Sequence, residues 1–208
     1  IVSEVKGAAF TYKGAPVQPA LATAKQASMD FGGKLTQTDT GFTYVFTNTL
    51  PANIDKTATH VIGGQATRNT REFVANAVYS YVPTGGAPVR REVVSTQACN
   101  QCHDPLAAHG GTRREVGLCS TCHTAQTTDP ESGNTVDLKV MVHKLHNGSK
   151  LPSVAAGKKS YSIVGYRQTV ADFSGTAWSQ DQRNCTTCHQ KGTQADNWKN
   201  APSRAACG

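Results

Sequence analysis

Short runs of alternating apolar and polar residues dominate the first half of the chain. In residues 42–47 aromatic residues alternate with smaller ones, which is the period of a half-buried strand. The preceding residues 38–41 are typical of a turn, so a β-hairpin is predicted there. Strands at this spacing, separated by glycine-rich turns, predict a mostly β, antiparallel barrel or sandwich domain over residues 1–94. The expected strands are residues 34–38, 42–47, 57–67, 73–82 and 89–94.

The pattern changes near residue 95. Beyond it, Leu138, Met141, Val142 and Leu145 follow the spacing i, i+3, i+4, i+7 of one apolar helix face. Asp137 precedes them and can cap the helix, so a helix is predicted over residues 138–146. The flanking residues 124–137 and 148–160 are rich in turn-forming types and are expected to be loops. We therefore expect residues 95–208 to form a second, loop-rich domain with short helices and little apolar core.

Composition indicates that apolar packing alone does not hold this fold. Of the 208 residues, 38% are hydrophobic and 7% are aromatic, whereas glycine contributes 19 and proline 9. No apolar run approaches the roughly 18–20 residues of a membrane-spanning helix. The formal net charge is +7. Because no pattern of interleaved basic and aromatic residues accompanies that charge, we expect no nucleic-acid partner.

The cysteines indicate what completes the second half. Six of the seven fall into three copies of C-x-x-C-H, the attachment signature of c-type haem. The two thiols add across the porphyrin vinyl groups, and the adjacent histidine binds the iron. A zinc ribbon, a dithiol redox motif or a disulfide framework are the alternatives, but zinc sites rarely place histidine after every second cysteine, and thioredoxin-like motifs come singly. The expected attachment residues are Cys99, Cys102, Cys119, Cys122, Cys185 and Cys188, and the proximal ligands are His103, His123 and His189.

Three bound haems would have two further consequences. Covalent attachment is completed outside the cytoplasm, so the periplasm or the cell surface is the expected compartment. The porphyrins would also supply the apolar mass that residues 95–208 lack. We therefore expect this half of the chain to be unfolded before haem is attached.

Each iron needs a sixth ligand unless its haem is catalytic. Methionine would raise the potential, but the chain has only Met29 and Met141, and Met141 falls on the apolar face of the predicted helix. Four histidines lie outside the motifs, and three of these accompany the three haem motifs in the second half. We expect His109, His143 and His146 to be distal ligands, and His60, inside a predicted strand, to be structural.

The spacing of these histidines limits their pairing. His143 and His146 are three residues apart, about 60° around a helix, so they cannot approach one iron from opposite sides. We expect them to serve two different haems. His109 is too close in sequence to His103 to cross easily to the far side of the same porphyrin, so it is expected to bind a neighbouring haem.

Cys207 is the one cysteine outside the complete motifs. It has no partner for a disulfide within the chain if the other six cysteines hold haem, which leaves two readings. One is an intermolecular disulfide. The reading we favour is that Cys207 and Gly208 begin a fourth C-x-x-C-H motif, so Cys207 is included among the expected haem-attachment residues.

Several stretches together resemble the OmcA/MtrC-type decahaem outer-surface cytochromes of metal-respiring bacteria. They are residues 90–94, 99–111, 138–148 and 183–189, and the resemblance covers nearly the whole chain. It implies a split Greek-key β-barrel followed by a multihaem domain of closely packed bis-histidine haems. By position, His109, His143 and His146 match the family's distal ligands. The chain departs from the family in having three complete motifs with one barrel, and residues 1–94 have no cysteine, so a redox switch proposed for a barrel cysteine pair cannot be transferred.

The leading functional hypothesis is electron transfer by hopping along bis-histidine haems, in respiration to extracellular acceptors. The expected location is the outer membrane or cell surface, with the periplasm as the alternative. Expected partners are other multihaem cytochromes or an outer-membrane porin–cytochrome complex, and expected acceptors are metal oxides, metal ions or flavin-like shuttles. A multihaem reductase with an open-coordination haem is the alternative from the enzyme class. A third hypothesis is a binding module that docks to a mineral, a polysaccharide or a partner cytochrome.

Overall fold

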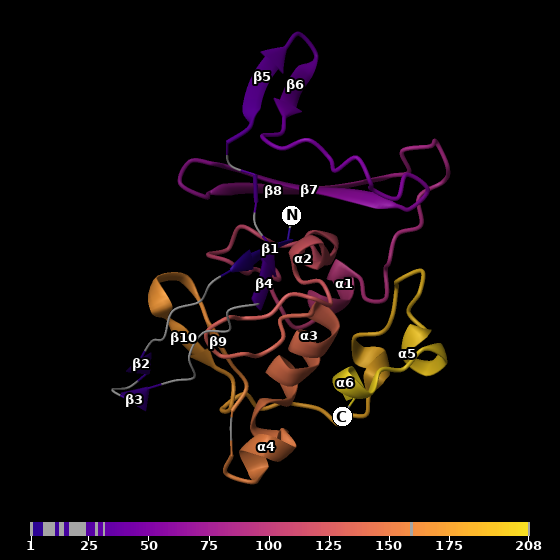
Figure 1. Cartoon of the computed structure of the whole chain (residues 1–208). Helices are drawn as coiled ribbons and strands as arrows, with labels where there is room; N and C mark the ends of the chain where they lie inside the picture. Colours follow the sequence, from indigo (N-terminus) through magenta and orange to yellow (C-terminus); the bar gives the residue numbers. More distant parts are fainter. Residues whose placement is uncertain are drawn as a thin grey trace.

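A computed structural model of the chain (Figure 1) describes residues 29–30, 32–158 and 160–207, with only the backbone of Cys207. Nearer the N-terminus it describes the backbone of four short strands. These are β1 (Val2–Val5), β2 (Thr11–Tyr12), β3 (Ala15–Pro16) and β4 (Ala24–Ala27). The side chain of Cys207, and with it the expected fourth attachment site, lies outside the described residues.

All of the described strands pair antiparallel and two by two. β5 (Lys34–Thr38) pairs with β6 (Gly41–Val45), and β7 (His60–Arg68) pairs with β8 (Phe73–Tyr81). The hairpin predicted at residues 34–47 and the strands predicted at 57–67 and 73–82 are thus confirmed, with ends that differ by up to three residues. In the described part of the chain these hairpins do not join into one closed barrel. The remaining pairs are β1 with β4, β2 with β3, and β9 (Ser162–Val164) with β10 (Val170–Asp172).

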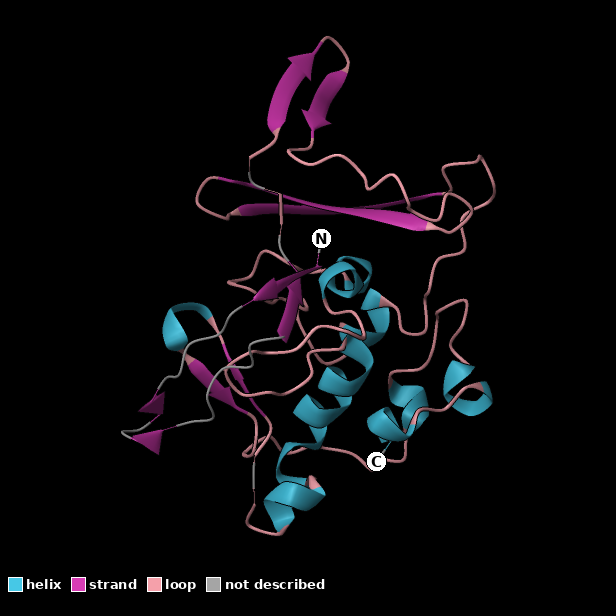
Figure 2. Ribbon diagram, in the orientation of Figure 1, coloured by secondary structure: helices cyan, strands magenta, loops and turns pink. Residues whose placement is uncertain are grey.

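The long β7–β8 hairpin lies across the helical half of the molecule and is fastened to it by one face (Figures 1 and 2). A Cβ on Gly63 would lie 2.6 Å from Cδ1 of Leu118, so the strand and α2 (Val116–Cys122) approach closely. The Asn76 side chain donates to the Thr112 carbonyl at 2.9 Å and accepts from the Arg114 N–H at 2.6 Å. These hydrogen bonds attach β8 to the residues just before α2.

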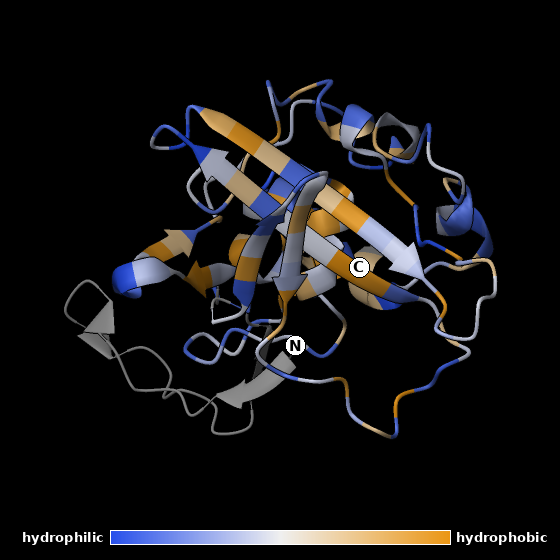
Figure 3. Ribbon diagram, turned by 90° about the horizontal axis from the view of Figure 1, so that it is seen from above, coloured by the Kyte–Doolittle hydropathy of each residue, from blue (hydrophilic) through white to orange (hydrophobic). Residues whose placement is uncertain are grey.

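The opposite face of the hairpin and the β5–β6 hairpin beyond it expose apolar side chains. Tyr79 is 66% exposed and Phe42 69% exposed, and ordinary alternation along the strands is visible in the hydropathy colours of Figure 3. No described residue between positions 29 and 94 is buried. The described side chains of residues 29–94 therefore form no core of their own, and the β7–β8 hairpin packs against α2 instead.

The prediction of a strand at residues 89–94 is wrong. Its backbone groups bond to side chains and to a distant loop instead of a neighbouring strand. The Val89 N–H donates to Oγ1 of Thr59 at 2.9 Å, and the Glu92 N–H donates to Oε1 of Gln194 at 3.1 Å. The Glu92 carbonyl in turn accepts from the Gln194 N–H at 3.1 Å. Residues 89–94 thus form an extended connection between the two halves.

The second half contains the predicted helix, α3 (Leu138–Asn147), with Asp137 at its N-cap. The Asp137 side chain accepts from the Lys139 N–H at 3.3 Å, as a capping carboxylate should. The stretch 148–160, predicted to be a loop, includes η1 (Gly148–Lys150) and α4 (Pro152–Ala155), because Pro152 sits at a favourable first helical position. The other helical segments are α1 (Thr96–Cys99), α2, η2 (Tyr166–Gln168), η3 (Cys185–Thr187), α5 (Asn197–Asn200) and α6 (Arg204–Cys207), which packs beside α3.

The core of the second half is small and partly polar. Its buried hydrophobic residues are Ala98, Leu118, Val140, Leu151 and Tyr161. Beside them, Thr127, Asp129 and Ser132 are at most 2% exposed. The predicted apolar face of α3 is only half-buried, and Val140 on another side is its buried residue. None of the described helices has both the length and the apolar character needed to cross a membrane.

Candidate haem sites

Each of the three C-x-x-C-H motifs forms one helical turn. The histidine N–H donates to the carbonyl of the first cysteine, at 3.1 Å for His103, 3.0 Å for His123 and 2.9 Å for His189. In a helical turn, residues i, i+3 and i+4 lie on the same face. The two thiols and the imidazole of each motif therefore gather on one side of the turn, which is what a single porphyrin requires of them.

Each motif histidine faces one of the three histidines that lie outside the motifs in this half. The ring centres are 6.2 Å apart for His103 and His146, 5.8 Å for His123 and His109, and 6.1 Å for His189 and His143. With metal–nitrogen bonds of about 2 Å, two imidazoles on opposite sides of one metal have ring centres about 6 Å apart. The three pairs have the separation of axial ligands on a shared iron, so the residues present fit a haem in each pair.

Backbone carbonyls fix the orientation of three of these rings. Nδ1 of His123 lies 2.9 Å from the Val136 carbonyl, and Nδ1 of His146 lies 2.8 Å from the Val142 carbonyl. Nδ1 of His143 bonds to the Lys139 carbonyl one helical turn back. A carbonyl can only accept, so Nδ1 carries the proton and Nε2 is left with its lone pair for a metal.

A tight turn presents His109 to His123. His109 has a φ of 51°, and Gly110 and Gly111 follow at 74° and 84°. Two hydrogen bonds between Ala108 and Arg113 close the turn, at 3.0 and 3.3 Å. His109 is exposed, yet desolvation, followed by the charges of Arg113 and His123, lowers its pKa to about 4. The imidazole is therefore neutral at physiological pH, as a metal ligand must be.

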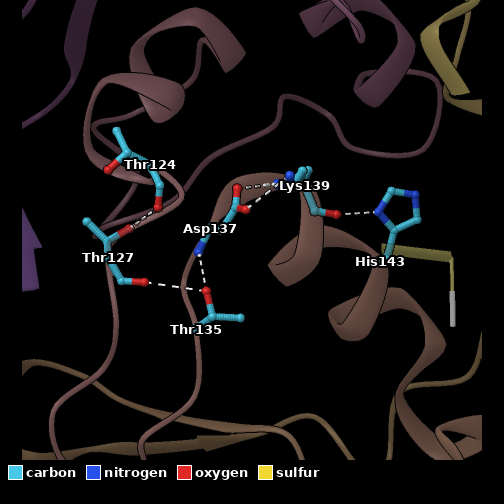
Figure 4. A network of polar contacts seen from close by, with 6 residues as sticks. All are labelled: Thr124, Thr127, Thr135, Asp137, Lys139 and His143. Atoms are coloured by element: carbon cyan, nitrogen blue, oxygen red, sulfur yellow. Dashed lines mark hydrogen bonds and ion pairs between the residues drawn. The ribbon is translucent and has the colours of Figure 1, made fainter. Parts of the chain in front are cut away.

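A chain of polar contacts connects the end of the second motif to His143 on α3, the histidine that faces His189 of the third motif (Figure 4). Oγ1 of Thr127 donates to the Thr124 carbonyl, immediately after His123, at 2.6 Å. The contacts continue through Thr135 to the Asp137 N–H and from Asp137 to Lys139, whose carbonyl holds His143. In addition, the Leu138 N–H donates to the His123 carbonyl at 3.0 Å. The start of α3 is thus attached directly to the second motif.

The attachment turns lie close to one another. Burial raises the pKa of the Cys99 thiol, and the neighbouring Cys188 and Cys119 thiols raise it further. The pKa of Cys188 is likewise raised by burial and then by Cys102 and Cys185. Nε2 of Gln190 donates to Oε1 of Gln101 at 3.1 Å, which joins the first and third motifs directly. The first motif therefore lies near both of the others.

His60 and Met29 make contacts away from the histidine pairs. Nε2 of His60 lies 2.7 Å from the Asp55 carbonyl, and its ring packs 5.7 Å from that of Tyr81. The Met29 sulfur accepts from Arg113 at 3.0 Å. Among the described residues there is no group of three or more His, Cys, Asp or Glu side chains arranged to hold a metal ion. The histidines of the second half come in pairs instead.

Two aromatic neighbours of the histidine pairs are absent from the sequence predictions. The Trp178 ring centre lies 5.1 Å from that of His146, and the Trp198 ring centre lies 6.4 Å from that of His189. The only sequence signal was their rarity, since the chain has two tryptophans. Nε1 of Trp198 and Nδ1 of His189 are buried without a hydrogen-bond partner. Burial, followed by the charge of His143, lowers the pKa of His189, and the nearby Val93 carbonyl partly opposes this by raising it.

Comparison with known proteins identifies the family. A family model described as outer membrane cytochrome MtrC/MtrF-like, domains II/IV, matches residues 91–207. The chain belongs to the MtrC/MtrF-like outer membrane cytochromes. Over 137 residues it is 31% identical to the multiheme cytochrome MtrC of Shewanella baltica (strain OS185), covering 54% of this chain and 20% of that protein.

A solved structure extends the likeness to the first half of the chain. The crystal structure of the outer membrane decaheme cytochrome OmcA matches with a TM-score of 0.80 and 28% identity, over 100% of this chain and 33% of that one. The chain thus spans about a fifth of the length of MtrC and a third of that of OmcA. Both of these relatives, like the family model, are multihaem or outer membrane cytochromes by description.

Proposed function

We propose that the chain binds three haems c, each between a motif histidine and a second histidine, and passes electrons among them. The observation that carries this proposal is the set of three ring pairs at 5.8 to 6.2 Å. The haem attached at Cys99 and Cys102 would have His103 and His146 as its axial ligands. The haem at Cys119 and Cys122 would have His123 and His109, and the haem at Cys185 and Cys188 would have His189 and His143.

When bound, each haem supplies a one-electron redox centre. Two imidazoles of the chain would hold each iron, and the Val136, Val142 and Lys139 carbonyls fix the orientation of three of the six, those of His123, His146 and His143. A redox centre whose ligands do not change with oxidation state reorganises little during electron transfer. The neighbouring motif turns, joined between Gln101 and Gln190, would keep successive centres close enough for hopping.

The larger arrangement we propose follows the family. Residues 1–94 would belong to a split Greek-key barrel and residues 95–208 to the multihaem domain, with Cys207 as the start of a fourth attachment site. The family model, which matches from residue 91 onward, supports a boundary near residue 95. In the whole protein, electrons would leave toward metal oxides, metal ions or flavin-like shuttles, after delivery from other multihaem cytochromes or a porin–cytochrome complex.

A multihaem reductase is the competing function. It requires a haem with an open position where substrate can bind. The proposed pairing leaves no open position at any of the three complete sites, because every motif histidine has a second imidazole opposite. This argues for a carrier whose reduction of metals would occur by outer-sphere electron transfer.

The test uses holoprotein matured with its covalent haems. Electron paramagnetic resonance of the oxidised protein should show low-spin ferric iron only, and added nitrite should leave the spectrum unchanged. Reduced holoprotein mixed with a soluble ferric chelate or a flavin should be reoxidised, as followed by haem absorbance. A high-spin haem that shifts on nitrite addition would favour the reductase instead.

A further inference from the structure

The indole ring of Trp178 packs edge to face against the imidazole ring of His146. The two ring centres are 5.1 Å apart and the ring planes are inclined by 82°. Trp178 is half-buried and lies in the segment between β10 and η3, outside every haem motif. It therefore approaches His146 from a part of the chain that binds no haem itself.

The Trp178 segment is anchored to the C-terminal end of α3 on both sides of the indole. On one side, the Ser149 N–H donates to the Thr176 carbonyl at 2.9 Å. On the other, Nε2 of Gln182 donates to Oδ1 of Asn147. Both anchors are within three residues of His146 in sequence, so the indole and the imidazole are held by the same short stretch of backbone.

Gly148 permits this close approach. A Cβ at that position would lie 2.6 Å from the Phe173 carbonyl oxygen and closer still to that of Thr176. With a φ of 38°, Gly148 also has a backbone conformation that other residues adopt at a cost. The end of α3 and the segment before Trp178 are in direct backbone contact.

The histidine pair next to Trp178 differs from the other two in the angle between its rings. The planes of His103 and His146 are inclined by 71°, whereas the angle is 36° for His109 and His123 and 23° for His143 and His189. The Val142 carbonyl restricts rotation of the His146 ring from one side. The indole packs at right angles against the same ring and opposes its rotation toward a parallel arrangement.

We propose that Trp178 is a positioning residue that holds His146 nearly perpendicular to His103 and so makes one haem magnetically distinct from the other two. This inference rests on the proposed axial pairing. Perpendicular imidazole planes leave the two iron dπ orbitals close in energy, which gives a strongly anisotropic low-spin spectrum. Nearly parallel planes separate those orbitals and give an ordinary rhombic spectrum. Outer contacts that orient a histidine are an established means of tuning a metal site.

The experiment is electron paramagnetic resonance of oxidised holoprotein, for the wild type and three variants. The wild type should show one strongly anisotropic low-spin haem and two rhombic ones. In Trp178→Leu the anisotropic signal should disappear and its intensity should join the rhombic signals, with all three haems still low-spin. Trp178→Phe, which keeps an aromatic edge, should retain the anisotropic signal. Trp198→Leu, beside the His189 pair, is the matched control and should retain it too.

Failure of this inference can be told apart from failure of the proposed function. Three low-spin haems in the wild type, with an anisotropic signal that persists in Trp178→Leu, would overturn the role of Trp178 and leave the axial pairing intact. Three rhombic haems in the wild type would overturn it as well. A high-spin haem in the wild type would refute the axial pairing on which the inference rests.

Discussion

Individual side chains in the second half are held by hydrogen bonds to the backbone more than by apolar burial. Three of the six proposed axial histidines have Nδ1 bonded to a carbonyl, which fixes both the tautomer and the ring orientation. The buried Asp129 carboxylate is likewise held by backbone groups, because it accepts from the Val164 N–H at 2.9 Å and from the Ser132 N–H. Small polar residues thus do the positioning that large apolar ones do in an ordinary core.

Glu131 beside Asp129 gives a prediction at this scale. Burial, followed by the hydrogen bond and the charge of Asp129, raises the pKa of Glu131. The folded protein thus holds this proton more tightly than the unfolded chain, where the pKa is about 4.3. Protonated Glu131 therefore contributes its full stabilisation below the unfolded-state pKa. This stabilisation is lost as the pH rises through the higher folded-state pKa. Glu131→Gln keeps a donor at every pH, so the variant should match the wild type near pH 4 and unfold at a higher temperature at pH 7.

Circular dichroism during heating of the holoprotein at both pH values measures this difference. Glu72→Gln removes a carboxylate from the exposed turn after β7 and serves as the control. A difference between Glu131→Gln and the wild type that is the same at both pH values would show that the protonation of Glu131 is not its cause.

At the scale of elements, the close approach between the end of α3 and the segment 173–178 depends on Gly148. Gly148→Ala adds backbone strain of about 1–3 kcal/mol, because a φ of 38° with a ψ of −104° lies outside the regions that other residues favour, and overpacking of about 1–3 kcal/mol. Gly157→Ala is a matched control, because Gly157 has a φ of 65° but open space around its Cβ position. It should lose about 1 kcal/mol for strain alone. Equal thermal destabilisation of the two variants would mean that the backbone contact at Gly148 contributes nothing.

The elements that sequence predicted well are those whose stabilising contacts are local. The α3 helix follows from its period and from the Asp137 cap, and the β5–β6 hairpin from a turn between alternating strands. Residues 89–94 have strand-forming side chains, but their backbone groups bond to Thr59 and Gln194, and distant partners leave no local trace. The second ligands were also predictable from the sequence, because three histidines outside the motifs accompany three motifs. The spacing of His143 and His146 further indicated that they serve two different haems. Which histidine faces which depends on the turn at His109 and on where α3 lies, so only the three-dimensional structure assigns the pairs.

At the scale of the whole molecule, five buried hydrophobic side chains are a small core for a second half of this length. The β5–β6 and β7–β8 hairpins of the first half bury none, and β7–β8 lies against α2 of the second half. We therefore predict that the chain produced without haem attachment is not compact. It should be cut rapidly by protease and should bind a hydrophobic dye such as ANS, whereas holoprotein should resist cleavage and bind little. An apo-chain as protease-resistant as the holoprotein would show that the polypeptide supplies enough core by itself.

The central claim is the pairing of each motif histidine with one particular second histidine. Its most direct test is the spin state of oxidised holoprotein in His109→Ala, His143→Ala and His146→Ala, with His60→Ala as the control. Each of the first three variants should convert one haem, and a different one, to high spin, and in His146→Ala the anisotropic signal should be the one lost. His60→Ala should remain fully low-spin. A variant among the first three that stays fully low-spin, or that changes two haems at once, would contradict the pairing.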